Sequence, residues 1–129
     1  LEAAERLGAV EVGEADLVFV RTGAASEGEH AEGSPGMAPE CVPWFAERRI
    51  ALLGADVAND PAPFREGAWP LPVHQLSLFH LGMPLVDNCD LDPLSEACAE
   101  AGRYAFLLVI APLRVKGGSG SPINPIAVF

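Results

Sequence analysis

Short apolar segments recur along the chain and predict β-strands. Leu17–Thr22 is a nearly continuous apolar run rich in β-branched and aromatic residues, which is typical of a buried strand. Ile50–Gly54 follows a helical segment directly, and this strand, helix, strand order with apolar strands indicates a parallel pair. We expect the other strands at Pro84–Asp87, Phe106–Ala111 (buried), Leu113–Lys116 and Ile126–Phe129, the last of them closing the sheet.

Helical spacing of apolar residues appears between these strands. A short helix is expected at Leu1–Leu7, and a second between Ala38 and Arg49, with two arginines in its last turn, where the helix dipole favours cations. Pro43 predicts either a kink or a regular helix that begins only near the proline, because an interior proline removes a backbone donor. Between the first strand and this helix, Gly23–Gly36 has no periodicity and predicts a long surface loop.

Two further helices are predicted in the second half of the chain. Pro72 is expected to begin a helix that runs to about Leu81 and is stopped by Gly82. Asp92 has the features of an N-cap, and the helix after it is ended by Gly102. The apolar stripe of this last helix consists of Leu94, Ala97, Cys98 and Ala101.

The charge balance narrows the choice of partners. The 129 residues include 18 acidic and 8 basic side chains, for a formal net charge of −10. A field of this sign repels phosphate backbones and anionic lipid, so we expect no nucleic acid and no membrane surface among the partners. Half of the residues are apolar and a fifth are charged, which predicts one compact domain over residues 1–129. The order of predicted strands and helices makes this an α/β domain.

The cysteines, the apolar stretches and the N-terminus bear on the cellular location of the protein. The longest apolar stretch, Tyr104–Leu113, is about half of the ~20 residues needed to cross a bilayer, and the N-terminus has no basic export signal. The three cysteines form no CxxC pair, so we expect a reducing, cytoplasmic location. Because the sequence opens without methionine and inside a predicted helix, we expect it to be part of a longer chain.

Few short motifs point to chemistry. The sequence has no HExxH, GxSxG or Walker loop, and Gly117–Pro122 is better explained as a plain turn than as an anion-binding loop, since it connects strand to strand. His74 and His80 are six residues apart on one predicted helix and point about 120° apart, so at most one faces a site. His74 is either a ligand or a satisfied, partly buried histidine.

Two aspartates follow predicted strands. A carboxylate at the carboxyl end of a strand in an α/β sheet often faces the ligand crevice, and Asp87 has this position. The alternative for Asp87 is an Asx turn with Asn88. Asp56 follows the strand Ile50–Gly54 in the same way, with the same two interpretations.

A series of short motifs then follows in a recognisable order along nearly the whole chain. The motifs are Leu17–Gly23, Pro35–Met37 leading into Trp44–Arg48, Leu53–Asp56, Pro72–His74, Pro84–Asn88, Phe106–Arg114 and Gly117–Pro122. As an ordered set they resemble the C-terminal part of the cyclase family of metal-dependent hydrolases, which includes bacterial kynurenine formamidase.

The resemblance implies a fold and a metal site. It implies a swivelling β/β/α fold, a mixed sheet with flanking helices that is incomplete without an N-terminal half. It also implies a divalent metal, Zn or Mn, that activates water to cleave an amide or related acyl bond. The family's HxGTHxDxPxH signature, which supplies most ligands, is absent here, and His30 stands alone in its segment. A family histidine at a helix start and an acidic residue after the next strand match His74 and Asp87, although the family usually has the longer Glu at the second position.

These implications lead to a specific hypothesis. The chain is part of an arylformamidase-like hydrolase of a small-molecule substrate, with His74 as catalytic residue and metal ligand, Asp87 as second ligand, and no activity as this fragment. The two side chains should converge within about 5 Å, near enough for metal bonds of about 2.0–2.2 Å. The alternative is a non-catalytic remnant or oligomerisation domain. Because the strands at Ile50 and Phe106 are apolar on both faces, we also expect exposed apolar surface and a homo-oligomer.

Overall fold

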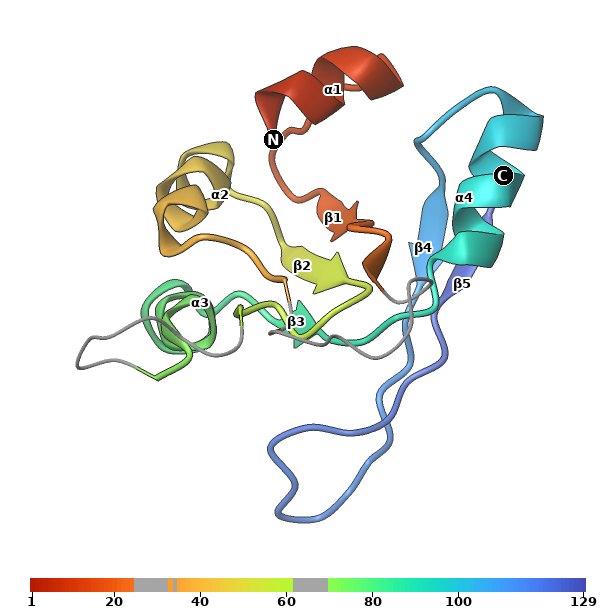
Figure 1. Cartoon of the computed structure of the whole chain (residues 1–129). Coiled ribbons are helices and arrows are strands. Elements are labelled where there is room, and N and C mark those ends of the chain that lie inside the picture. The colour runs from red at the N-terminus through yellow and green to blue at the C-terminus, as the bar shows by residue number, and fades with distance from the viewer. Residues whose placement is uncertain (25–32, 34, 62–69) are drawn as a thin grey trace.

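A computed structural model describes residues 1–24, 33, 35–61 and 70–129 of the chain. Figure 1 shows a small central sheet with helices around it and a second pair of strands on one side. Most of the predicted loop Gly23–Gly36, including His30, lies outside the described residues.

The central sheet has three parallel strands in the order β1-β2-β3. Val18 of β1 pairs with Leu53 of β2, which pairs in turn with Leu85 of β3. All four residues of the middle strand are buried. The predicted parallel pair is therefore confirmed, and the carboxyl ends of all three strands meet at one edge. The strands are β1 (Leu17–Val20), β2 (Leu52–Ala55) and β3 (Leu85–Val86).

The connection from β1 to β2 is helical, as expected. A single 3-10 turn, η2 (Pro39–Cys41), leads into α2 (Val42–Arg48), and Pro43 lies in the first turn of α2, where its missing N–H costs nothing. Of the two predicted outcomes for this proline, the structure confirms the helix that begins near it. A short N-terminal helix, α1 (Glu2–Gly8), precedes β1.

The helix predicted from Pro72 to Leu81 forms with two geometries. Its first part is α3 (Pro72–His74), and the rest, η3 (Gln75–Leu81), is a π-helix with a wider turn. The helix stops at Gly82, which has the left-handed backbone angle that glycine adopts without strain. The predicted end is therefore confirmed, whereas the π-helical turn is a feature that the prediction lacked.

The last helix, α4 (Asp92–Ala101), ends at Gly102 as predicted. Its N-cap is Leu91, so the prediction of Asp92 as N-cap is wrong by one residue. The carboxylate of Asp92 instead accepts a hydrogen bond from Nε of Arg21, just after β1, at 2.7 Å. The side chain is thus engaged by a neighbouring segment and makes no cap hydrogen bond to its own helix.

Strands β4 (Leu107–Val109) and β5 (Ile126–Val128) form a separate antiparallel pair. Three expectations are corrected here: the last strand does not close the parallel sheet, Leu113–Lys116 is not a strand, and β4 is not buried. Leu107 is 65% exposed and its cross-strand partner Val128 is 48% exposed. An apolar run predicts burial only if some other element covers it, and within the described residues nothing does so on this pair.

The core lies between the central sheet and the helices α2 and α3, which Figure 1 shows on one side of it. Phe45 of α2, Leu53 of β2 and Val73 of α3 are its largest fully buried apolar side chains. This packing holds the start of α3 against the sheet. In the part of the chain that the structure describes, no helix has both the length and the apolar character needed to cross a membrane.

Candidate functional site

The candidate site lies at the carboxyl edge of the central sheet. Asp87 follows β3 directly, and the loop after β2 carries Asn59 and Asp60. The start of α3 brings His74 to the same place. Because β2 and β3 are parallel neighbours, residues that follow them meet at one end of the sheet, which is where ligands bind in open α/β sheets.

His74 lies between two carboxylates. Its Nδ1 is 2.6 Å from Oδ2 of Asp60, and its Nε2 is 3.2 Å from Oδ2 of Asp87. The predicted convergence of His74 and Asp87 within about 5 Å is therefore confirmed as geometry. The structure adds Asp60, which no motif or predicted element in the sequence singles out.

Asp60 also anchors the beginning of α3. Its Oδ1 accepts the backbone N–H of Val73 at 2.7 Å, and its Oδ2 accepts the backbone N–H of His74 at 3.0 Å. These are first-turn donors that have no partner within the helix, so the carboxylate satisfies them as a capping residue would. One side chain thus fixes both the helix end and the imidazole ring that this end carries.

Asp87 is held from its other side by Asn59. Its Oδ1 accepts the backbone N–H of Asn59 at 2.9 Å and the side-chain amide of Asn59 at 2.8 Å, which leaves Oδ2 to face His74. The N–H of Asn88 donates to the carbonyl of Val57. The carboxylate therefore points toward the imidazole, as the ligand interpretation of Asp87 requires.

The two carboxylates change the proton affinity of His74. Burial by itself lowers the pKa of the imidazole, but the hydrogen bond with Asp60 and the charge of Asp87 outweigh it and raise the pKa above its ordinary value of 6.5. The imidazole between these two carboxylates therefore holds a proton more tightly than a free imidazole does.

Asp56 has a structural role. Its carboxylate accepts the N–H and the hydroxyl of Thr22 and the N–H of Gly23, each at 2.8 Å. Burial alone would raise the pKa of this carboxyl, but the hydrogen bonds from Thr22 and Gly23 lower it below its usual value. These bonds reach residues 33 and 34 positions earlier in the chain, so they are not the Asx turn of the second interpretation; Asp56 ties the end of β1 to the end of β2.

The other candidate residues do not join this cluster. His80 is exposed on η3, and Cys98 is buried in the core side of α4, as predicted. Burial and the charges of Asp87 and Asp56 raise the pKa of the Cys89 thiol, so its reactive thiolate form is disfavoured. All three cysteines are free.

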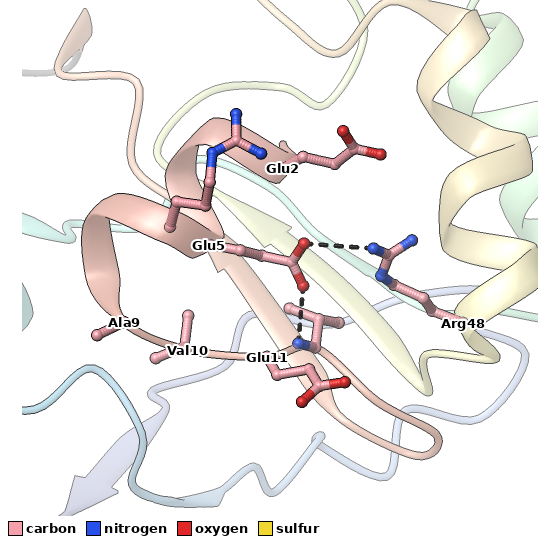
Figure 2. Close-up of a pocket in the computed structure, with 8 residues that line it drawn as sticks. Glu2, Glu5, Ala9, Val10, Glu11 and Arg48 are labelled. Atoms are coloured by element: carbon pink, nitrogen blue, oxygen red, sulfur yellow. Dashed lines mark hydrogen bonds and ion pairs between the residues drawn. The ribbon is translucent and has the colours of Figure 1, made fainter.

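A pocket lies elsewhere, between α1 and Arg48 of α2 (Figure 2). The carboxylate of Glu5 lines this pocket, where it accepts the backbone N–H of Val12 at 2.8 Å and forms an ion pair with Arg48 at 3.3 Å. Arg48 also covers the ring of Trp44 at 3.8 Å. Glu5 and Arg48 of this pocket are thus engaged with each other, and His74 and Asp87 do not line it.

The donor atoms that face each other across the candidate site suit a transition metal. An imidazole nitrogen and a carboxylate oxygen are ligands that Zn²⁺ and Mn²⁺ accept, and bonds of about 2.0–2.2 Å allow Nε2 of His74 and Oδ2 of Asp87 to bind one ion. Within residues 1–24, 33, 35–61 and 70–129, no group of three or more histidine, cysteine or acidic side chains is arranged to hold a metal. The residues thus fit a metal as two of the three or four protein ligands that such an ion needs.

Comparison with known proteins gives matches to one family. Residues 1–60 match the family model Cyclase, whose description reads "Putative cyclase". A solved structure described as that of a novel cyclase is 32% identical to this chain and has a TM-score of 0.87, over 99% of this chain and 45% of the other. A second, described as a potential metal-dependent hydrolase with cyclase activity, is 20% identical with a TM-score of 0.66, over 95% of this chain and 55% of the other, and it shows likeness of fold. A search of curated protein sequences finds no match.

The family model and the 32% identical structure agree with each other, and the shared fold extends over nearly all of this chain. The chain spans about half the length of the two solved structures, 45% and 55%. The mixed α/β fold of the described residues, with its parallel and antiparallel strand pairs, is the one predicted from sequence. The chain is thus similar to the cyclase family, in sequence over residues 1–60 and in fold over nearly its whole length.

Proposed function

We propose that this chain supplies part of the metal centre of a hydrolase that cleaves an amide or related acyl bond in a small molecule. The observation that carries the proposal is the facing pair of Nε2 of His74 and Oδ2 of Asp87, 3.2 Å apart at the carboxyl edge of the sheet. The description of the second solved structure as a potential metal-dependent hydrolase supports the same reaction class.

The residues of the site have distinct roles in this proposal. His74 and Asp87 would hold the ion, and Asn59 keeps the carboxylate of Asp87 in place through two hydrogen bonds. When bound, a divalent metal supplies a nucleophile from water near neutral pH and polarises the scissile carbonyl. Because both donor atoms are held by neighbouring groups before any ligand arrives, the site needs little rearrangement to bind the ion.

The substrate class in the proposal is an N-acyl or lactam-like small molecule, and the enzyme class is arylformamidase-like. Its support is the ordered set of motifs from Leu17 to Pro122 that resembles the family with this activity. The proposal also includes a homo-oligomer, supported by the exposed apolar strands β4 and β5, and a reducing cytoplasmic setting, supported by the three free cysteines.

The test compares two proteins from the same gene. One is the 129-residue chain, and the other is the product of the longest reading frame that contains it; both are assayed with zinc or manganese on an aryl formamide. We expect the shorter protein to show no turnover near the ~1 per second typical of slower enzymes, since it offers two ligands, and the longer one to be active. Enzyme-like turnover by the 129-residue chain, or no metal-dependent activity in the longer protein, would contradict the proposal.

A further inference from the structure

Asp60 is buried at the N-terminal end of α3, where its carboxylate accepts the backbone N–H groups of Val73 and His74 and faces Nδ1 of His74. We propose that Asp60 is the positioning residue of the site: it holds the proton of neutral His74 on Nδ1 and so directs the lone pair of Nε2 toward Asp87. The value of this arrangement for metal binding rests on the proposed function. The proton position itself does not, because it follows from the contacts of the metal-free protein.

The first step of the argument is a competition between two acceptors for the ring proton. Asp60 lies 2.6 Å from Nδ1, whereas Asp87 lies 3.2 Å from Nε2, so the hydrogen bond with Asp60 is the shorter one. The side chain of Asp60 is fully buried, and that of Asp87 is 32% exposed and can be solvated by water. A charge-assisted hydrogen bond is stronger where water is excluded. A ring with one proton therefore keeps it on Nδ1.

The second step concerns the orientation of the ring. The same oxygen of Asp60, Oδ2, accepts the backbone N–H of His74 and faces its Nδ1, while Oδ1 accepts the N–H of Val73. The carboxylate is thereby fixed relative to the backbone from which the imidazole projects. The ring is held by a group attached to its own helix end, so its orientation does not depend on a ligand being present.

The third step is the support of Asp60 itself. Gly36 lies against the backbone of Asp60 and Pro61, and the N–H of Met37 donates to the carbonyl of Asn59 at 2.7 Å. The segment at Gly36 and Met37 thus fixes the loop that carries Asp60. An aspartate behind a histidine is the arrangement that, in metal proteins generally, sets the tautomer and the direction of the ligating nitrogen.

The experiment measures the tautomer of His74 in the 129-residue chain without metal. Histidine is labelled with ¹⁵N, chelator is added, and two-bond ¹H–¹⁵N spectra are recorded at a pH high enough to leave the ring neutral; the His74→Gln variant assigns the signals among the three histidines. We expect the wild-type ring to carry its proton on Nδ1. A proton on Nε2 in the wild-type protein overturns the proposal. Because this measurement is made on the wild-type protein, it does not depend on whether a variant folds.

The informative variant is Asp60→Asn. In this variant the carbonyl oxygen still accepts the N–H of Val73, and the bond from the backbone N–H of His74 to Oδ2 is lost. The amide group that faces Nδ1 donates to it, which moves the ring proton to Nε2. Asp56→Asn is the matched control, because it neutralises another buried aspartate after β2 that bonds Thr22 and Gly23. We expect the tautomer to reverse in Asp60→Asn and to stay unchanged in Asp56→Asn. The wild-type tautomer in Asp60→Asn, or reversal in both variants, overturns the proposal.

Zinc affinity is the second readout, and it is measured in the longer protein, where the proposed function expects the remaining metal ligands. With Nε2 protonated, His74 must lose that proton before it can bind, so we expect Asp60→Asn to bind zinc about 10- to 100-fold more weakly than the wild type. Reversed tautomer with unchanged zinc affinity would overturn the positioning role. If the wild-type and control proteins bind no zinc while the tautomers behave as expected, the proposed function fails and the assignment of Asp60 to the ring stands.

Discussion

Gly36 lies so close to Asp60 that a Cβ atom at Gly36 would be 2.3 Å from the carbonyl carbon of Asp60. The atoms that this Cβ would meet belong to the backbone of Asp60 and Pro61, so no flexible side chain can move away to make room for it. We expect Gly36→Ala to lower the free energy of unfolding by about 2 kcal/mol or more, within the usual range for overpacking.

The measurement for this first prediction is denaturant unfolding followed by circular dichroism. Gly120→Ala is the control, since a Cβ atom there meets nothing within 4 Å and should change stability by no more than about 0.5 kcal/mol. Equal stability of the two variants would show that the Gly36 segment does not pack on Asp60 as described.

A second prediction concerns acid stability and Asp56. The pKa of this carboxyl is lower in the folded chain than its ordinary value of 3.8, because Thr22 and Gly23 donate to the ionised form. The folded protein therefore binds its proton less readily than the unfolded one, and the carboxylate stabilises the fold fully above pH 3.8 and progressively less as the pH falls through the folded pKa. At neutral pH we expect Asp56→Asn to cost about 1–3 kcal/mol, through unsatisfied donors.

Unfolding curves of wild type and Asp56→Asn from pH 7 downward check this prediction. The difference in stability should be constant near neutrality and should shrink below pH 3.8. Glu100→Gln, which removes an exposed carboxylate of α4, should show neither effect. A stability difference that grows as the pH falls would contradict the prediction that folding lowers the pKa of Asp56.

The parts of the fold that sequence could predict are those set by local pattern. The apolar run at Leu17, the helix that begins near Pro43 and the helix stop at Gly82 depend on residues that lie next to each other in the chain. The π-helical turn of η3 could not be predicted in this way, because nothing in the sequence of Gln75–Leu81 distinguishes it from an ordinary α-helix.

The candidate site was predictable only in part, because sequence pattern marks element boundaries but not contacts between distant segments. His74 and Asp87 could be singled out because each follows a recognisable boundary, a helix start and a strand end. Asp60 lies 14 residues before His74 in a segment with no periodicity, and its role exists only once the chain returns to the sheet edge. The burial of β4 was mispredicted because an apolar strand does not reveal whether a covering element is present.

A third prediction concerns self-association through β4 and β5. Leu107 and Val128 face the solvent as a cross-strand pair, and Phe129 beside them is 41% exposed, which is unusual for so many adjacent apolar side chains. We expect the purified chain to associate in a concentration-dependent manner and to bind a hydrophobic dye. Sedimentation velocity over a hundredfold range of concentration is the measurement.

Leu107→Lys is the variant that tests this surface, because a charge directly on the exposed pair opposes its burial against another copy. We expect this variant to shift the protein toward monomer and to reduce dye binding. Leu7→Lys changes an equally apolar, 90% exposed residue on α1 and should have little effect. A wild-type chain that stays monomeric throughout, or equal effects of the two variants, would contradict an interface at β4 and β5.

The fourth prediction separates a metal pair from an ordinary ion pair at His74 and Asp87. In the longer protein, His74→Ala should remove bound metal and hydrolase activity together, and Asp87→Ala should lower the affinity for metal by about 100-fold or more, since each removes a ligand where loss of a supporting group alone costs about 10- to 100-fold. Metal content after dialysis and activity at saturating metal are measured in parallel. His80→Ala, which removes an exposed histidine of η3 outside the cluster, is the control and should retain both. If His74 and Asp87 were held only by attraction between imidazolium and carboxylate, both variants would lose stability at neutral pH while metal content and activity per folded molecule stayed unchanged, and the metal assignment would then be wrong.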